Sequence, residues 1–198
     1  MNHKNIIDKD YVFNNTYNLT GCLTIIDSEL DNVNITASNF FCEDTVNFIR
    51  SSGSLNDIRI KNSKSDSLDA DFSNLQIQNI LIENSNNDCL DFSYGNYYVE
   101  NSELKNCGDK AISVGEKSIF NINKLNINNA NIGVASKDSS DVNIKEAKIR
   151  NVKFCLSAYK KKQEFNSATI KINNLNCANF AEKLYTEKNS TILVNNEF

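Results

Sequence analysis

The sequence contains no proline and no tryptophan, and it has only six glycines and one histidine among its 198 residues. No apolar run approaches the ~18 residues that a membrane span requires, so no membrane span is expected. The net charge of −4 argues against a nucleic-acid partner, because proteins that bind nucleic acids carry a basic surface. These absences leave a mainly acidic chain of a size that suits one globular domain.

The six cysteines form no CxxC pair and show no metal-binding spacing. Most of them lie beside apolar residues, where a thiol packs as a small hydrophobic group. We therefore expect free, buried thiols, which favours the reducing cytoplasm. The segment Met1–Lys4 also lacks the apolar core of a secretory signal, as expected for a cytoplasmic protein or for a mature domain excised from a longer one.

Asparagine is abundant, with 35 residues, and much of it recurs at a fixed place in an internal repeat. The pattern apolar-x-apolar-x-Asn ends successively at Asn62, Asn84, Asn106, Asn129 and Asn151, at spacings of 22, 22, 23 and 22 residues. A second alternating pattern follows each asparagine, at Leu68–Asp71, Leu90–Ser93, Ile112–Gly115, Val134–Lys137 and Leu156–Tyr159. Alternation with period two is typical of a half-buried strand.

Short strands that return every ~22 residues without a helical segment exclude βαβ units, whose crossovers need a helix. We predict an all-β fold, a right-handed parallel β-helix of about seven to eight coils, with a cap or lead-in over residues 1–22 and one repeat domain over 23–198. The repeated asparagines are expected to turn the chain and to stack as a hydrogen-bonded ladder. Residues 160–167 form an insertion, and an uncapped C-terminal end would favour a homo-oligomer or a larger parent protein.

The outward positions of the second strand predict a functional face. One column runs through Asn47, Asp69, Asp91, Ser113, Ala135 and Ser157. We predict catalytic roles for Asp69, Asp91 and Lys137, and substrate contacts for Asp71, Glu116, Asp138, Tyr159 and Lys160. A Ca²⁺ site is a further option at Asp66, Asp88 and Asp109, and no other cofactor is indicated.

Stacking Asp69 on Asp91 places two carboxyl groups about 5 Å apart, and their repulsion amounts to roughly 3 kcal/mol at an effective dielectric of 20. Three arrangements relieve it: a bound cation, a raised pKa on one carboxyl group, or a neighbouring lysine such as Lys110 or Lys137. Such a pair can serve as general acid and base on a glycosidic bond. The alternative is a solvated acidic face that keeps the rod soluble.

The ~22-residue coil and the asparagine ladder resemble the pectate-lyase-like right-handed parallel β-helix superfamily, including the repeat modules of bacterial extracellular proteins. The segment Asn87–Asp91 resembles an aspartate motif of polygalacturonases, but the Gly-His-Gly and downstream Arg-x-Lys segments of those enzymes are absent. The resemblance implies a polysaccharide partner docked across the strands and an extracellular or cell-surface location.

Two functions therefore stand side by side. The first is a carbohydrate-active module that binds an extended polysaccharide on the aspartate face, with cleavage or epimerisation as further options; Lys137, Tyr159 and Lys160 are the candidate bases. The second is a non-catalytic rod that stacks on a partner domain or subunit.

Overall fold

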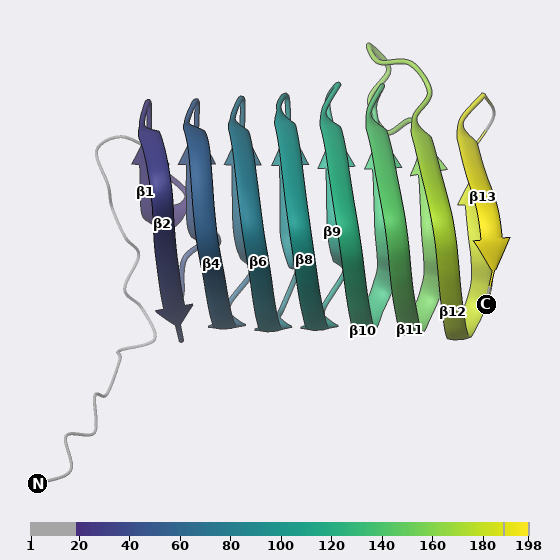
Figure 1. The fold of residues 1–198 in the computed structure, drawn as a ribbon, viewed down its shortest axis with the longest axis horizontal. Coiled ribbons are helices and arrows are strands. Elements are labelled where there is room, and N and C mark those ends of the chain that lie inside the picture. Colours follow the sequence, from purple (N-terminus) through teal and green to yellow (C-terminus); the bar gives the residue numbers. More distant parts are fainter. Residues whose placement is uncertain (1–18, 188, 198) are drawn as a thin grey trace, which may run out of the picture.

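The computed structural model describes residues 19–187 and 189–197 as a parallel β-solenoid of thirteen strands, with no helix among these residues. The strands are β1 Gly21–Ile26, β2 Glu29–Ser38, β3 Asp44–Ile49, β4 Ser52–Ser63, β5 Asp66–Asp71, β6 Asn74–Ser85, β7 Leu90–Ser93, β8 Asn96–Cys107, β9 Lys110–Gly115, β10 Ile119–Lys137, β11 Asp141–Tyr159, β12 Thr169–Thr186 and β13 Thr191–Glu197. About eight coils of ~22 residues stack along one axis (Figure 1). The predicted fold class is confirmed.

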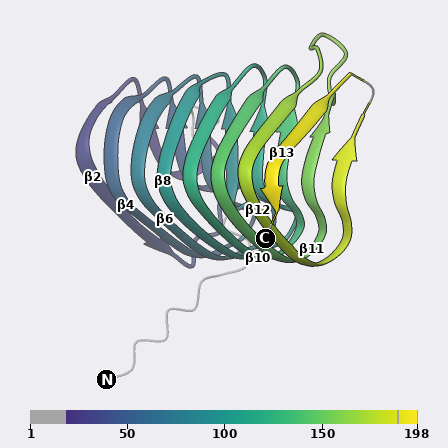
Figure 2. The ribbon, with the colours of Figure 1, turned by 45° about the vertical axis from the view of Figure 1, so that its right-hand side comes forward.

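Each coil contributes to two faces. The short strands β1, β3, β5, β7 and β9 pair in that order, and the last residues of β10, β11 and β12 continue the row; we call this the short-strand face. The long strands β2, β4, β6 and β8, the first parts of β10–β12, and β13 form the long-strand face. The long strands curve around the core (Figure 2).

The coil is right-handed. In Figure 1 the nearer strands run downward and the fainter, more distant strands run upward while the chain advances from left to right. This is the hand expected for parallel crossovers of twisted strands. Strand β1 already begins at Gly21, and residues 1–18 of the predicted lead-in lie outside the described residues.

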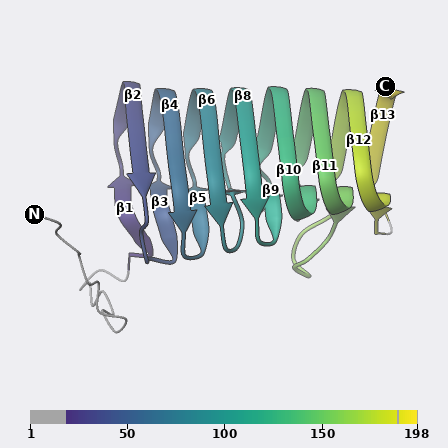
Figure 3. The same ribbon diagram turned by 90° about the horizontal axis from the view of Figure 1, so that it is seen from below.

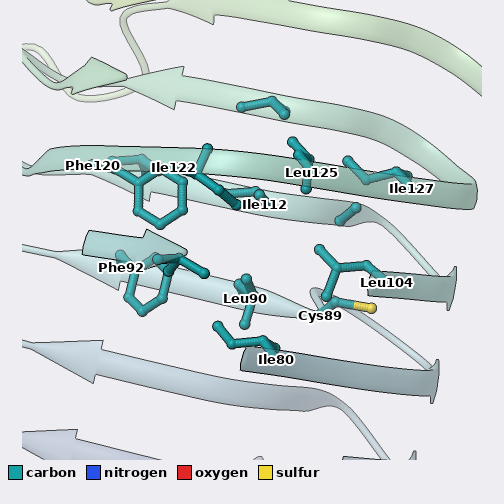
Figure 4. Packing of buried hydrophobic residues seen from close by; sticks show 14 of the residues in the cluster. Ile80, Cys89, Leu90, Phe92, Leu104, Ile112, Phe120, Ile122, Leu125 and Ile127 are labelled. Carbon is teal, nitrogen blue, oxygen red and sulfur yellow. The ribbon is translucent and has the colours of Figure 1, made fainter. Parts of the chain in front are cut away.

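The core is a set of inward columns in register. One column runs Val46, Leu68, Leu90, Ile112, Val134 and Leu156, all fully buried. In the neighbouring column Phe48, Ala70 and Phe92 alternate in size, which lets successive layers interdigitate. The Phe92 ring packs on Phe120 at a centroid distance of 5.3 Å (Figure 4). This continuous stack holds the outer faces in a fixed register.

The asparagine ladder is confirmed at the bend that precedes the short-strand face. All of its members adopt left-handed backbone geometry, with φ between 56° and 72°. Asn84 Nδ2 donates to Asn62 Oδ1 at 2.8 Å, and Asn106 Nδ2 donates to Asn84 Oδ1 at 2.9 Å. The ladder also extends to Asn39 and Asn179, but Asn151 donates to Asn128 rather than to Asn129.

The prediction of free cysteines is wrong, because all six are paired: Cys22–Cys42, Cys89–Cys107 and Cys155–Cys177. The partners are 18 to 22 residues apart, close to one coil, so parallel stacking brings them side by side. Their apolar neighbours pointed to burial but carried no information on pairing. The inference of a reducing compartment from free thiols falls with this correction.

Candidate functional site

The predicted outward column exists on the short-strand face. Asn47, Asp69 and Asp91 are direct register partners on β3, β5 and β7. The column continues through Ser113 of β9, Ala135 of β10 and Ser157 of β11. Because the strands are in register, side chains about 22 residues apart in sequence form one continuous row.

Lys137 lies over this row. It is 5% exposed, and its Nζ lies 4.0 Å from Asp91 Oδ1, two coils away. Its side chain passes beside Gly115, where a Cβ would lie in ordinary contact with Lys137 Cε, at 3.4 Å. The structure thus brings the predicted Asp91 and Lys137 together.

Asp69 lies among several other carboxyl groups. Burial raises the pKa of its carboxyl group to about 9, and the nearby Asp71, Asp44, Asp91 and Asp66 add to the shift. Asn47 Nδ2 donates to Asp69 Oδ2 at 2.6 Å. Two of the three expected forms of relief therefore occur together: a raised pKa on Asp69 and a lysine beside Asp91.

The three residues considered for Ca²⁺ are held by other partners. Asp66 Oδ1 accepts from the backbone N–H of Asp88 at 2.7 Å, and Asp88 Oδ1 accepts from the backbone N–H of Lys110 at 2.8 Å. The Lys110 ammonium group forms ion pairs with both Asp88 and Asp109. Within the described part of the chain, no three His, Cys, Asp or Glu side chains are grouped to hold a metal ion. As arranged, these residues do not fit a Ca²⁺ site.

Lys110 interacts electrostatically with Asp88 and Asp109. Burial works to lower its pKa, but the neighbouring Asp88 and Asp109 outweigh it and raise the pKa above its usual range. Burial raises the pKa of Asp88 to about 6 despite the opposing effect of Lys110. For Tyr159, burial raises the pKa to about 12, so its hydroxyl group is neutral at physiological pH and does not act as a ready base.

The insertion, residues 160–168 between β11 and β12, is fastened to the turns of the preceding coils and projects beyond the outline of the coils (Figure 3). Asp138 Oδ1 accepts from the backbone N–H groups of Lys161 and Lys162 at 2.7 and 2.8 Å. Lys162 Nζ lies 2.7 Å from Glu116 Oε1. Asp138 is fully buried beneath the insertion and anchors this loop.

Two predicted substrate residues remain beside the row. Burial acts to raise the pKa of Glu116, but hydrogen bonds from Lys162 and Ser93 outweigh it and hold the pKa below its usual range. Burial raises the pKa of Asp71, with further contributions from Asp91 and Glu116. Lys160 is exposed, and its backbone N–H donates to Glu187 Oε2 at 3.3 Å, away from the aspartates.

Sequence reasoning missed an aromatic pair at the bend that follows the short strands. Phe72 and Tyr94 are 53% and 41% exposed, and their rings stack at a centroid distance of 4.6 Å with an interplanar angle of 6°. Both residues have positive φ values, 52° and 51°, which are unusual for bulky side chains. A strained backbone that presents exposed rings is typical of functional positions. The sequence signal was an aromatic residue directly after β5 and directly after β7.

A separate groove of about 490 Å³ lies on the long-strand face, between the same coils. Its lining includes one register column, which runs Arg59, Leu81, Glu103, Asn126 and Lys148. Glu103 stands between Arg59 and Lys148 along this column, so its charges alternate in sign, whereas the short-strand face stacks the carboxyl groups of Asp69 and Asp91. We therefore place the candidate site on the short-strand face.

Comparisons with known proteins identify no relative. No family model, no curated protein and no solved structure matches this chain. No helix within the described residues is long and apolar enough to cross a membrane. Its function is therefore inferred from the geometry of its own residues.

Proposed function

We propose that the protein binds an extended polysaccharide along the short-strand face, as in the pectate-lyase-like superfamily that its repeat resembles. The observation that carries this proposal is the stacked, exposed pair Phe72 and Tyr94 directly beside the polar row of Asp69 and Asp91. Flat rings pack against the apolar faces of sugar rings, and adjacent polar groups bind the hydroxyl groups. The three disulfides also support an oxidising compartment, where extracellular glycans occur.

Binding can be tested by replacing the rings. Tyr94→Ala and Phe72→Ala should each weaken binding to a responsive glycan by about tenfold, the effect of losing one aromatic contact. Phe180→Ala is the matched control, because Phe180 is similarly exposed, at 40%, but lies on β12 at the asparagine bend. A glycan array identifies the responsive glycan, and calorimetry measures affinity. Equal losses in all three variants, or no binding to any glycan, would contradict the proposal.

A second step, cleavage of the bound glycan, is favoured by the Asp69 and Asp91 pair. Burial raises the pKa of Asp69 to about 9, so it keeps a proton to donate at neutral pH. Neighbouring strands lie ~4.8 Å apart, close to the ~5 Å carboxyl separation of retaining glycosidases. In this scheme Asp69 donates the proton to the leaving oxygen while Asp91 forms an ester with the anomeric carbon, and water then hydrolyses this ester as Asp69 takes back a proton. Loss of turnover with retained binding in Asp91→Asn would support it, and unchanged turnover would exclude it.

Assembly is the alternative function. Phe180, Tyr185 and Leu193 on the last two strands are 38% to 50% exposed and would be covered by a partner domain or a second copy. Sedimentation over a wide concentration range tests this alternative. A strict monomer, with no change in Leu193→Asp, would count against self-assembly.

A further inference from the structure

The short-strand face gathers carboxyl groups at its N-terminal end with few cations beside them. Six carboxyl groups gather on and around β3, β5 and β7, namely Asp44, Asp66, Asp69, Asp71, Asp88 and Asp91. Lysine lies within ion-pair distance of Asp88 and Asp91 alone, through Lys110 and Lys137, when only the described residues are considered. The four other aspartates have no lysine or arginine within ion-pair distance among those residues, so the carboxyl groups without a paired cation are concentrated on β3 and β5.

Buried hydrogen-bond acceptors without partners lie inside this group. Asn47 is 1% exposed, and its Nδ2 is committed to Asp44 Oδ2 at 3.3 Å and Asp69 Oδ2 at 2.6 Å. Within the described residues, Asn47 Oδ1 and Asp91 Oδ1 are buried without a hydrogen-bond partner, as is the hydroxyl of the fully buried Ser113 next in the row. An amide or carboxylate oxygen can only accept a hydrogen bond. The missing partner is therefore a donor.

The arrangement favours a donor that repeats along the axis over a single metal ion. The aspartates are distributed over successive coils ~4.8 Å apart, and the described residues offer no three-residue group that could surround one ion. A protonated amine has three N–H donors and no acceptor, so it fits a site that has only acceptors to offer. Amines repeated along a chain would meet the aspartates coil by coil.

We propose that the glycan bound on this face carries free amino groups, as in a polymer of deacetylated amino sugars, with its ammonium groups among Asp44, Asp69 and Asp71 and hydrogen-bonded to Asn47 Oδ1. This inference rests on the proposed polysaccharide function and specifies its substrate class. A bound ammonium group would explain why carboxyl groups gather on β3 and β5, because a cation stabilises the ionised carboxylates that burial disfavours. Lys137 limits the cationic ligand to the N-terminal coils, since its ammonium group already lies 4.0 Å from Asp91 Oδ1.

The experiment compares a β-1,4-linked glucosamine hexamer with its fully N-acetylated form by calorimetry in mildly acidic buffer, where the sugar amines are protonated. The glucosamine hexamer should bind at least about tenfold more tightly, the usual effect of a hydrogen bond to a charged group. The variant Asp69→Asn/Asp71→Asn should remove this preference. Asp141→Asn is the matched control, because Asp141 is exposed at the start of β11 on the long-strand face, and it should change nothing. Added salt should weaken the preferred binding.

The outcomes separate this inference from the function on which it rests. Equal binding of both hexamers, with Tyr94→Ala weakening both, overturns the amino-sugar specificity but leaves polysaccharide binding intact. Failure of these hexamers and of every glycan on an array overturns both. Spermidine supplies ammonium groups without sugar rings. If it binds as tightly as the glucosamine hexamer and is unaffected by Tyr94→Ala, the site is a polyamine site and the glycan assignment is wrong.

Discussion

Replacing Asp69 by asparagine should stabilise the protein at neutral and alkaline pH. Asp69 lies in an outward row but is largely covered, and four other aspartates surround it. Asparagine has the same shape as aspartate, and its amide oxygen can still accept the hydrogen bond from Asn47 Nδ2. The amide of Asn47 on β3 would then stack on a second amide on β5. The substitution therefore removes a titratable group from a desolvated position at little cost in packing.

The size and sign follow from the proton balance. Burial raises the pKa of Asp69 from 3.8 to about 9, so between these values the folded protein holds a proton that the unfolded chain has released. Stability then falls as pH rises from about 4 to 9. At neutral pH the loss amounts to about 4 kcal/mol, at 1.36 kcal/mol for each pKa unit between 3.8 and the working pH. Below pH 4 Asp69 is protonated in both states, and the effect disappears.

Thermal and urea unfolding of the wild type and of Asp69→Asn across this pH range measure the difference. The variant should melt on the order of 10 °C higher at neutral pH and near the wild-type temperature at pH 4. Asp141→Asn, on the exposed start of β11, controls for the general loss of one negative charge. A variant that is less stable at neutral pH, or a difference that is independent of pH, would refute the assigned burial of Asp69.

Three further predictions concern the scaffold. Cys89→Ala/Cys107→Ala should lose about 3 kcal/mol of stability, because this disulfide closes a loop of 18 residues. Reductant should abolish the difference between the variant and the wild type. Equal melting temperatures without reductant would contradict the prediction. Asn106→Ala should lose about 1–2 kcal/mol and Asn106→Gly less, since φ is 56° there and glycine retains that geometry; urea unfolding ranks the two. Asp138→Ala should make residues 160–168 about tenfold more sensitive to trypsin, because the backbone N–H groups of Lys161 and Lys162 lose their acceptor. An unchanged cleavage rate would mean that other contacts hold the loop.

The fold could be predicted from the sequence because each sequence repeat corresponds to one coil of the solenoid. Asparagines 22 or 23 residues apart occupy one structural position, so their spacing gave the coil length, the register and the outward column of Asp69 and Asp91. The path of the side chains across coils could not be predicted. Lys137 reaches Asp91 across two coils, and this relation has no local sequence pattern.

The cysteine prediction failed for a physical reason. The cysteine spacings of 18, 20 and 22 residues were compared with motifs for metals and redox centres, although a coil of ~22 residues makes such spacings a sign of contact. Asp138 was expected in the turn after the strand, but its place under the insertion, with positive φ, could not be predicted from the sequence. Alternation predicts which face a strand residue occupies, and it stops being informative where the strand ends.

The outward column of the short-strand face differs in composition from the other outward columns of this fold. Elsewhere the outward columns stack neutral amides, as in Asn74 with Asn96, or alternate charges, as in Lys61 with Glu83. On this face the column stacks Asp69 on Asp91, and the adjoining corner holds Phe72 and Tyr94 in a backbone conformation that disfavours them. A solvated acidic surface would account for the charge but not for strained, exposed rings beside buried acceptors without partners. Because local inconsistency concentrates at functional sites, the conjunction of these features favours a ligand over solubility as the reason for this face.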